Sequence, residues 1–110
     1  MDEQDILREI FRRFRTRPGA AKRGVRVGVG DDAAVVRIGR TDVVITTDAI
    51  VEGIDFDLGY FQWSDVGYKA VSAAVSDLYA CGASPHAFLI TSGIPKGAAP
   101  ANVRSLMNGL

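Results

Sequence analysis

The residues of this chain best suited to chemistry are aspartates and threonines that follow apolar or glycine-rich segments. The clearest case begins with a β-branched run over 43–45, which predicts a buried strand. Thr46, Thr47 and Asp48 follow at once. Hard oxygen ligands at the end of a rigid strand are suited to Mg²⁺. A strand that simply ends in a polar turn explains the same residues equally well.

Three further carboxylates are also candidates for metal ligands. Gly53 predicts a bend, after which Asp55 and Asp57 follow closely. Asp77 lies within a helical pattern of small and apolar residues, where a carboxylate is costly without a partner. A neighbouring backbone group is one possible partner, and a metal ion is another. The residues alone therefore make a Mg²⁺–phosphate site plausible without deciding for it.

A glycine-rich segment, residues 28–33, matches a loose G-x-G-x-x-A pattern with Asp31 and Asp32 inside it. The dinucleotide-binding fingerprint must open a helix, whereas the residues after this segment predict a strand. Two adjacent aspartates also oppose a bare pyrophosphate unless a cation lies between them. Gly28 and Gly30 are candidates for cofactor binding, and tight backbone geometry explains them equally well.

Hydrophobic periodicity and turn residues predict the elements that must position these side chains. In chain order they are a helix over 2–15 stopped by Pro18-Gly19, strands over 25–29, 33–38 and 43–47, a helix over 65–80, a strand over 86–90 and a helical pattern from 101. Residues 39–42 predict a hairpin turn between two of the strands. Ser64 is the expected N-cap of the long helix and Gly82 its stop.

Length and composition limit the function classes. The 110 residues suffice for one domain with a modest core. Its 13 basic and 13 acidic residues balance, so no global charge steers the chain toward nucleic acid or a membrane. Cys81 is the only cysteine, which excludes an internal disulfide and makes a reducing cytoplasm the default. We expect a single cytoplasmic domain, and its end within a helical pattern indicates a fragment of a longer protein.

Several motifs, taken in order and spacing, resemble the thiamine-monophosphate kinase family, within the aminoimidazole-ribonucleotide-synthetase-like superfamily. They are GVGDDAA over 28–34, TTDAIVEG over 46–53, GYKA over 67–70 and SDLYACGASP over 76–85. Each motif alone is weak, and their succession is specific. The resemblance implies an α/β (α+β) fold, the N-terminal domain of that superfamily, with a mixed sheet packed by helices. It also implies a homodimer whose sheets pair across the subunits, and a C-terminal domain that is absent here.

The same resemblance implies ATP-dependent, Mg²⁺-assisted phosphorylation of thiamine monophosphate to thiamine diphosphate, with the isolated fragment inactive. The magnesium ligands of the family match a set of oxygen-bearing residues here. They are Asp32, Thr46, Thr47, Asp48 and Asp77, with Asp31 as a neighbour of the set. Neither nucleic acid nor a membrane is an expected partner.

One departure from the family leaves the acceptor open. Residues 51–56 read VEGIDF, so Asp55 stands where the family has a histidine that reaches the substrate. An ionised carboxylate cannot donate to a phosphate and repels it unless a metal intervenes. A related ATP-dependent enzyme with another small acceptor is therefore a second hypothesis. A non-catalytic dimerisation module is a third, in which the aromatic loop at 58–63 and the helix of small residues over 65–80 serve assembly only.

Overall fold

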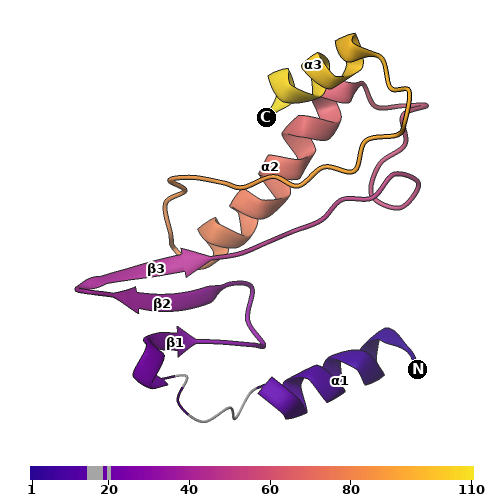
Figure 1. The fold of residues 1–110 in the computed structure, drawn as a ribbon. Helices are drawn as coiled ribbons and strands as arrows, with labels where there is room; N and C mark the ends of the chain where they lie inside the picture. Colours follow the sequence, from indigo (N-terminus) through magenta and orange to yellow (C-terminus); the bar gives the residue numbers. More distant parts are fainter. Residues whose placement is uncertain (15–18, 20) are drawn as a thin grey trace. The chain divides into compact units, whose positions relative to one another are not determined.

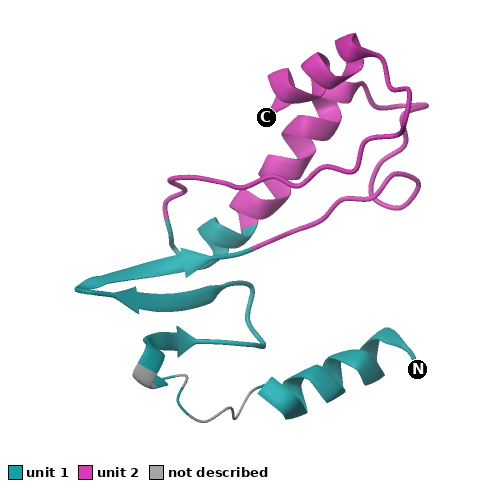
Figure 2. Ribbon diagram, in the orientation of Figure 1, with its two compact units in different colours: residues 1–46, 77–83 teal, residues 47–76, 84–110 magenta. Residues whose placement is uncertain are grey.

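The structure is a computed structural model that describes residues 1–14, 19 and 21–110. The predicted stop at Pro18 and the end of the first predicted helix, at Arg15, lie outside these residues. In chain order the elements are α1 (Glu3–Phe14), η1 (Ala21–Arg23), β1 (Val25–Val27), β2 (Ala34–Ile38), β3 (Thr41–Ile45), α2 (Trp63–Ala80) and α3 (Pro100–Gly109) (Figure 1). They fall into two compact units (Figure 2). Unit 1 comprises residues 1–46 and 77–83, and unit 2 comprises residues 47–76 and 84–110.

Helix α1 of unit 1 confirms the predicted amphipathic helix. Two aspartates cap its start reciprocally, because Asp5 N donates to Asp2 Oδ1 at 2.8 Å and Asp2 N donates to Asp5 Oδ2 at 3.3 Å. Larger apolar residues at helical spacing remain exposed, namely Ile6, Ile10 and Phe14. The helix therefore presents an apolar stripe that is not fully covered within unit 1.

The sheet of unit 1 has three strands in the order β1-β2-β3. The predicted hairpin is confirmed, although β3 begins at Thr41 instead of at 43, because Gly39 and Arg40 alone form the turn. Gly39 has φ +61°, which suits the first central position of a type II′ hairpin turn. Both strand pairs are antiparallel, where the resemblance implied a mixed sheet, because such short connections join antiparallel neighbours only. The α+β class itself is confirmed.

The two faces of this sheet differ in chemistry, because side chains alternate along each strand. One face carries the cross-strand pair Val36 and Val43, together with Ile38 and Ile45, which are 60% and 52% exposed. This face is therefore apolar and open to solvent within unit 1.

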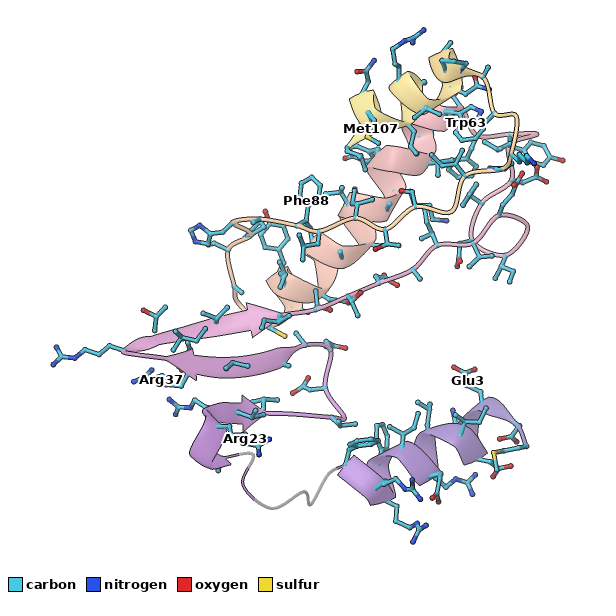
Figure 3. All side chains as sticks on the ribbon, viewed as in Figure 1. Glu3, Arg23, Arg37, Trp63, Phe88 and Met107 are labelled. Carbon is cyan, nitrogen blue, oxygen red and sulfur yellow. The ribbon has the colours of Figure 1, made fainter. Side chains whose placement is uncertain are left out.

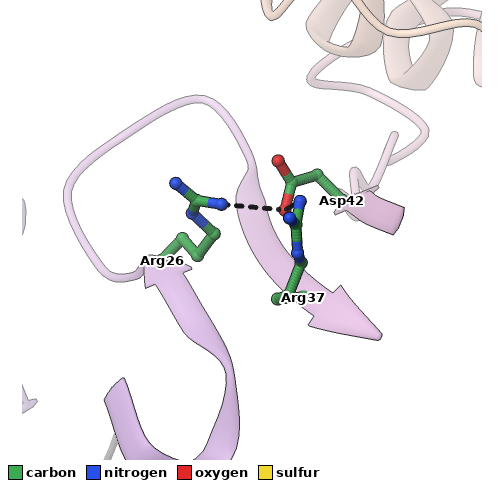
Figure 4. Close-up of polar contacts among 3 residues, drawn as sticks. All are labelled: Arg26, Arg37 and Asp42. Carbon is green, nitrogen blue, oxygen red and sulfur yellow. Dashed lines mark hydrogen bonds and ion pairs between the residues drawn. The ribbon is translucent and has the colours of Figure 1, made fainter. Parts of the chain in front are cut away.

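The opposite face carries an ion-pair cluster that joins all three strands. Arg37 lies in register with Asp42, and its Nη1 is 3.0 Å from Asp42 Oδ1. Arg26 Nη1 lies 3.4 Å from the same oxygen (Figure 4). Two guanidinium groups thus share one carboxylate on an exposed surface.

The start of α2, in unit 2, corrects the predicted N-cap. The helix begins at Trp63 (Figure 3), and Gln62 N donates to Asp65 Oδ2 at 2.9 Å. Asp65 at the third helical position therefore satisfies the amide of the capping residue, as in one half of a capping box. Ser64 lies inside the helix and is not its N-cap, because the helix begins one residue earlier, at Trp63.

Helices α2 and α3 of unit 2 approach each other at a pair of glycines. A Cβ on Gly67 would collide with the backbone of Leu106, and one on Gly109 would collide with the backbone of Ser64. Gly67 is buried and Val66 beside it is only 7% exposed. Glycine is therefore required here for close approach of the two helix backbones. Helix α3 confirms the helical pattern predicted from 101.

The predicted strand over 86–90 is wrong. Residues 83–95 have no regular secondary structure and pair with none of the described strands. Phe88, which Figure 3 labels, is 59% exposed. Leu89 beside it is 101% exposed. An apolar run favours a strand, but a strand forms only where a neighbour supplies hydrogen-bonding partners.

Candidate functional site

The glycine-rich loop and the end of β3 meet in unit 1. Thr46, the first residue after β3, donates its Oγ1 hydrogen to the backbone carbonyl of Asp32 at 3.1 Å. Ala33, which follows Asp32, is only 6% exposed and fixes that side of the loop in the core. The hydroxyl of Thr46 therefore lies beside the loop that carries Asp31 and Asp32, although the sequence patterns identified these residues separately.

Backbone conformation explains part of the glycine-rich motif. Gly30 has φ +112°, a region that residues with a Cβ rarely adopt, and no atom lies within 4 Å of the place a Cβ would take. Gly28 and Gly30 are both exposed. Asp31 Oδ1 accepts a hydrogen bond from Asp32 N at 2.8 Å, which tightens the turn. The loop thus presents open backbone beside two carboxylates.

The end of α2 brings Asp77 and Cys81 to unit 1. Asp77 lies in the last turn of α2 and is half-buried, and its carbonyl accepts from Cys81 N at 3.3 Å. Gly82 has φ +70°, and Ala83 N donates to Leu78 O at 3.0 Å, as in a Schellman motif. The predicted stop at Gly82 is therefore confirmed, and it fixes the backbone that carries Cys81.

The pKa of the Cys81 thiol is affected by desolvation and by three carboxylates of unit 1, those of Asp31, Asp32 and Asp77. Partial desolvation is the largest cause that raises the pKa of Cys81 above its ordinary value, followed by the negative charges of these three aspartates. Cys81 is nevertheless exposed, so solvent reaches this electronegative region. A raised pKa leaves less thiolate at neutral pH, which disfavours Cys81 as a nucleophile.

Thr47 and Asp48 belong to unit 2, although they follow Thr46 directly in the chain. Both are exposed, and Asp48 Oδ1 accepts from Ala49 N at 2.8 Å. Their side chains offer oxygen atoms to solvent.

Asp55 of unit 2 closes a turn of its own loop. Its Oδ2 accepts a hydrogen bond from Val51 N at 2.7 Å. The predicted bend at Gly53 is confirmed by φ +80° and by a hydrogen bond from Gly53 N to Phe56 O at 2.7 Å. The carboxylate predicted as a substrate contact is therefore engaged with the backbone of its own turn.

Lys69 is a candidate that the sequence reasoning missed. Its Nζ donates to the backbone carbonyl of Asp55 and lies 5.5 Å from the centroid of the Phe61 ring. The available signal was its place in the GYKA motif over 67–70.

The oxygen-bearing side chains of unit 1 are of the chemical type that Mg²⁺ binds. Carboxylate and hydroxyl oxygens are the hard ligands that Mg²⁺ prefers, and this ion keeps several waters when few protein ligands are present. Among residues 1–14, 19 and 21–110, no group of three or more His, Cys, Asp or Glu side chains is already arranged to hold a metal. None of the helices in these ranges is long and apolar enough to cross a membrane.

Comparison with known proteins places these features in a family. Residues 30–110 match the family described as AIR synthase related protein, N-terminal domain. The chain is 30% identical to the thiamine-monophosphate kinase of Bacillus subtilis (strain 168), over 100% of this chain and 33% of that protein. It is 36% identical to the enzyme of that name from Mycobacterium tuberculosis (strain ATCC 25618 / H37Rv), over 78% of this chain and 26% of that protein.

A third relative, the thiamine-monophosphate kinase of Rhodopirellula baltica, is 36% identical over 84% of this chain and 30% of that protein. The chain therefore spans about a third of the length of the curated relatives it matches. No solved structure gives a significant match. Because the family match extends from Gly30 to Leu110, most of its length, this chain belongs to the AIR synthase related protein family and carries its N-terminal domain.

Proposed function

We propose that this chain is the N-terminal part of a cytoplasmic thiamine-phosphate kinase, which transfers a phosphoryl group from ATP to thiamine monophosphate. The family and the names of the relatives support the reaction and both substrates. The observation that carries the proposal is the hydrogen bond from the Thr46 hydroxyl at the end of β3 to the glycine-rich loop at Asp32, next to Asp31. Besides partial desolvation, the negative charges of Asp31, Asp32 and Asp77 raise the pKa of Cys81, which adds support. Carboxylate and hydroxyl oxygens of this kind suit a cation that meets phosphate.

The proposed magnesium ligands are oxygen-bearing side chains at the ends of β3 and α2 and in the glycine-rich loop. They are Asp32, Thr46, Thr47, Asp48 and Asp77, with Asp31 beside them. Mg²⁺ held there would neutralise charge on the phosphates of ATP and orient them. Gly28 and Gly30 contribute open backbone that lets a phosphate approach. Phosphoryl transfer depends mainly on positioning and charge neutralisation, and it does not require Cys81 as a nucleophile.

Calorimetric titration of the full-length protein with a non-hydrolysable ATP analogue tests this proposal. We expect binding that requires Mg²⁺ and weakens about ten-fold or more in Asp77→Asn, because a charged ligand contact contributes about 1.5–3 kcal/mol. Asp57→Asn is the matched control, since Asp57 accepts from Gly59 N in unit 2 and is outside the proposed ligand set. Binding that ignores both Mg²⁺ and the Asp77 substitution would contradict the proposal.

The protein is also proposed to act as a homodimer. The exposed apolar face of the unit 1 sheet, with Ile38 and Ile45, supports this assembly. Sedimentation of the full-length protein tests it: Ile45→Lys should shift the population toward monomer. Ile54→Lys, which alters an 81% exposed residue of unit 2, should not. Equal sedimentation of both variants and the wild type would argue against this interface.

A second candidate function keeps the fold and ATP but changes the acceptor. The observation that favours it is the Asp55 carboxylate, which is bound to Val51 N and carries no positive charge for a phosphate. Asp55→His in the full-length protein should improve the use of thiamine monophosphate if this is the acceptor. No improvement favours a different acceptor.

A non-catalytic dimerisation module makes a different prediction. In such a module Asp48→Asn and Asp77→Asn leave stability unchanged or raise it by relieving repulsion, with no effect on nucleotide binding. The calorimetric titration separates this outcome from the kinase proposal.

A further inference from the structure

Lys69 holds a positive charge in a partly enclosed position of unit 2. Its ammonium donates to the carbonyl of Asp55 on one side and lies over the ring of Phe61 on another. An ammonium has three donors, and neither a carbonyl nor a ring neutralises its charge. Lys69 is half-buried, so water covers the charge only in part.

The carboxylate expected to pair with Lys69 forms a hydrogen bond with the backbone instead. Asp65, one turn earlier on α2, is the expected partner at the i,i+4 spacing. Its carboxylate instead accepts from Gln62 N at 2.9 Å. The four ion pairs found in the described parts of the chain do not include Lys69. A partly buried charge without an anionic partner is costly, which makes an external anion a favourable occupant.

The loop that faces Lys69 is fixed before any ligand arrives. The Asp55 carboxylate closes the turn at Val51, and the Asp55 carbonyl accepts from Lys69 itself. Phe61, at the end of the same loop, is half-buried, and its ring lies 5.5 Å from the Lys69 Nζ. The ammonium therefore has a defined position, which lowers the entropic cost of binding a ligand.

We infer that Lys69 binds a phosphate group of a substrate and supplies the positive charge that Asp55 cannot. The inference rests on the proposed function for the identity of the ligand, which is a phosphate ester of either the acceptor or ATP. In this arrangement Asp55 is a positioning residue, which holds its carbonyl and its turn against Lys69. Lys69 is the residue that contacts the phosphate.

Protection from acetylation tests phosphate binding without any assay of activity. The full-length wild-type protein is treated with acetic anhydride, with and without inorganic phosphate or pyrophosphate, and modification is measured peptide by peptide. We expect phosphate to slow modification of Lys69 several-fold. Modification of Lys96, an exposed lysine of unit 2, should remain unchanged and serves as the internal control. Equal modification of Lys69 with and without phosphate would overturn the inference.

Substitution of Lys69 then identifies the source of the phosphate. Lys69→Met keeps an unbranched side chain of similar length and removes the charge, and we expect a KM increase of about ten- to a hundred-fold for one substrate. A rise for thiamine monophosphate indicates the phosphate of the acceptor, and a rise for ATP indicates that of the nucleotide. Lys69→Arg should retain binding better than Lys69→Met because it keeps the charge, and Lys96→Met should behave as wild type.

The two proposals fail in different ways. If the wild-type protein does not phosphorylate thiamine monophosphate, the proposed function fails, while phosphate protection of Lys69 still decides this inference. Suppose that both Lys69→Met and Lys69→Arg lose stability and that neither changes the KM of either substrate. Lys69 then has a purely structural role, and the inference is overturned. Circular dichroism of each variant distinguishes loss of folding from loss of phosphate binding.

Discussion

Thr46 donates a hydrogen bond from its hydroxyl to the backbone carbonyl of Asp32 at 3.1 Å, and so joins the end of β3 to the glycine-rich loop. The hydroxyl uses its hydrogen in this contact and keeps its lone pairs available. One side chain therefore fixes the loop while its oxygen remains able to meet a cation.

We expect Thr46→Val to lower the free energy of unfolding by about 1 kcal/mol, because it removes this hydrogen bond and leaves shape nearly unchanged. Thr46→Ser should retain most of the stability. Thr41→Val is the control, since Thr41 is exposed at the other end of β3. Denaturant unfolding measures all three, and equal midpoints for Thr46→Val and wild type would show that the bond contributes nothing.

The Cys81 thiol should report on the charge of its neighbours. Desolvation and then the charges of Asp31, Asp32 and Asp77 raise its pKa, so alkylation by iodoacetamide at neutral pH should be slow. Asp77→Asn removes one negative charge and should lower that pKa, which moves the pH profile of the rate to lower pH. Asp57→Asn should not, because Asp57 is not among the residues that affect this thiol.

Added Mg²⁺ should act on Cys81 in the same direction as Asp77→Asn, because a bound cation neutralises the same carboxylates. The alkylation rate of the wild type at a fixed neutral pH should rise with Mg²⁺ and saturate. A rate that Mg²⁺ leaves unchanged would count against these aspartates as magnesium ligands.

Asp42 should stabilise the sheet because it forms ion pairs with both Arg26 and Arg37. Asp42→Asn leaves Arg26 and Arg37 facing each other without a counter-ion, and we expect a loss of about 0.5–1 kcal/mol, kept small because all three side chains are exposed. The loss should shrink at high salt, since screening weakens exposed charge interactions. Arg40→Met alters an exposed turn arginine outside the cluster and should have little effect. A salt-independent loss would point to packing instead of charge.

Gly67→Ala should be severely destabilising, because its methyl group would meet the backbone of Leu106. Overpacking of this kind costs about 1–3 kcal/mol or more, as a backbone cannot rotate away. Gly93→Ala is the matched control, since no atom lies within 4 Å of its Cβ position. Similar unfolding midpoints for the two variants would show that α2 and α3 do not depend on this close approach.

Local sequence patterns correctly predicted several helices and the hairpin. The apolar spacing of α1, the helical pattern of α3 and the hairpin at Gly39 follow from periods and turn residues within a few positions of each other. The start of α2 was misplaced because Ser64 and Asp65 are both residue types found at helix N-termini, and only the folded structure shows that the helix begins at Trp63 with Asp65 accepting from Gln62 N. The strand over 86–90 failed because strand formation depends on a partner that local sequence does not specify.

For the candidate site, the sequence identified the residue types, and the folded structure determined which of these residues contact one another. Asp32 and Thr46 are 14 residues apart, as are Asp55 and Lys69, and nothing local in the chain predicts that either pair meets. The role of Asp55 in its own turn and the uncompensated charge of Lys69 emerged only from the folded chain. Contacts of this kind depend on how loops return to an element, which tertiary packing fixes and local propensity does not.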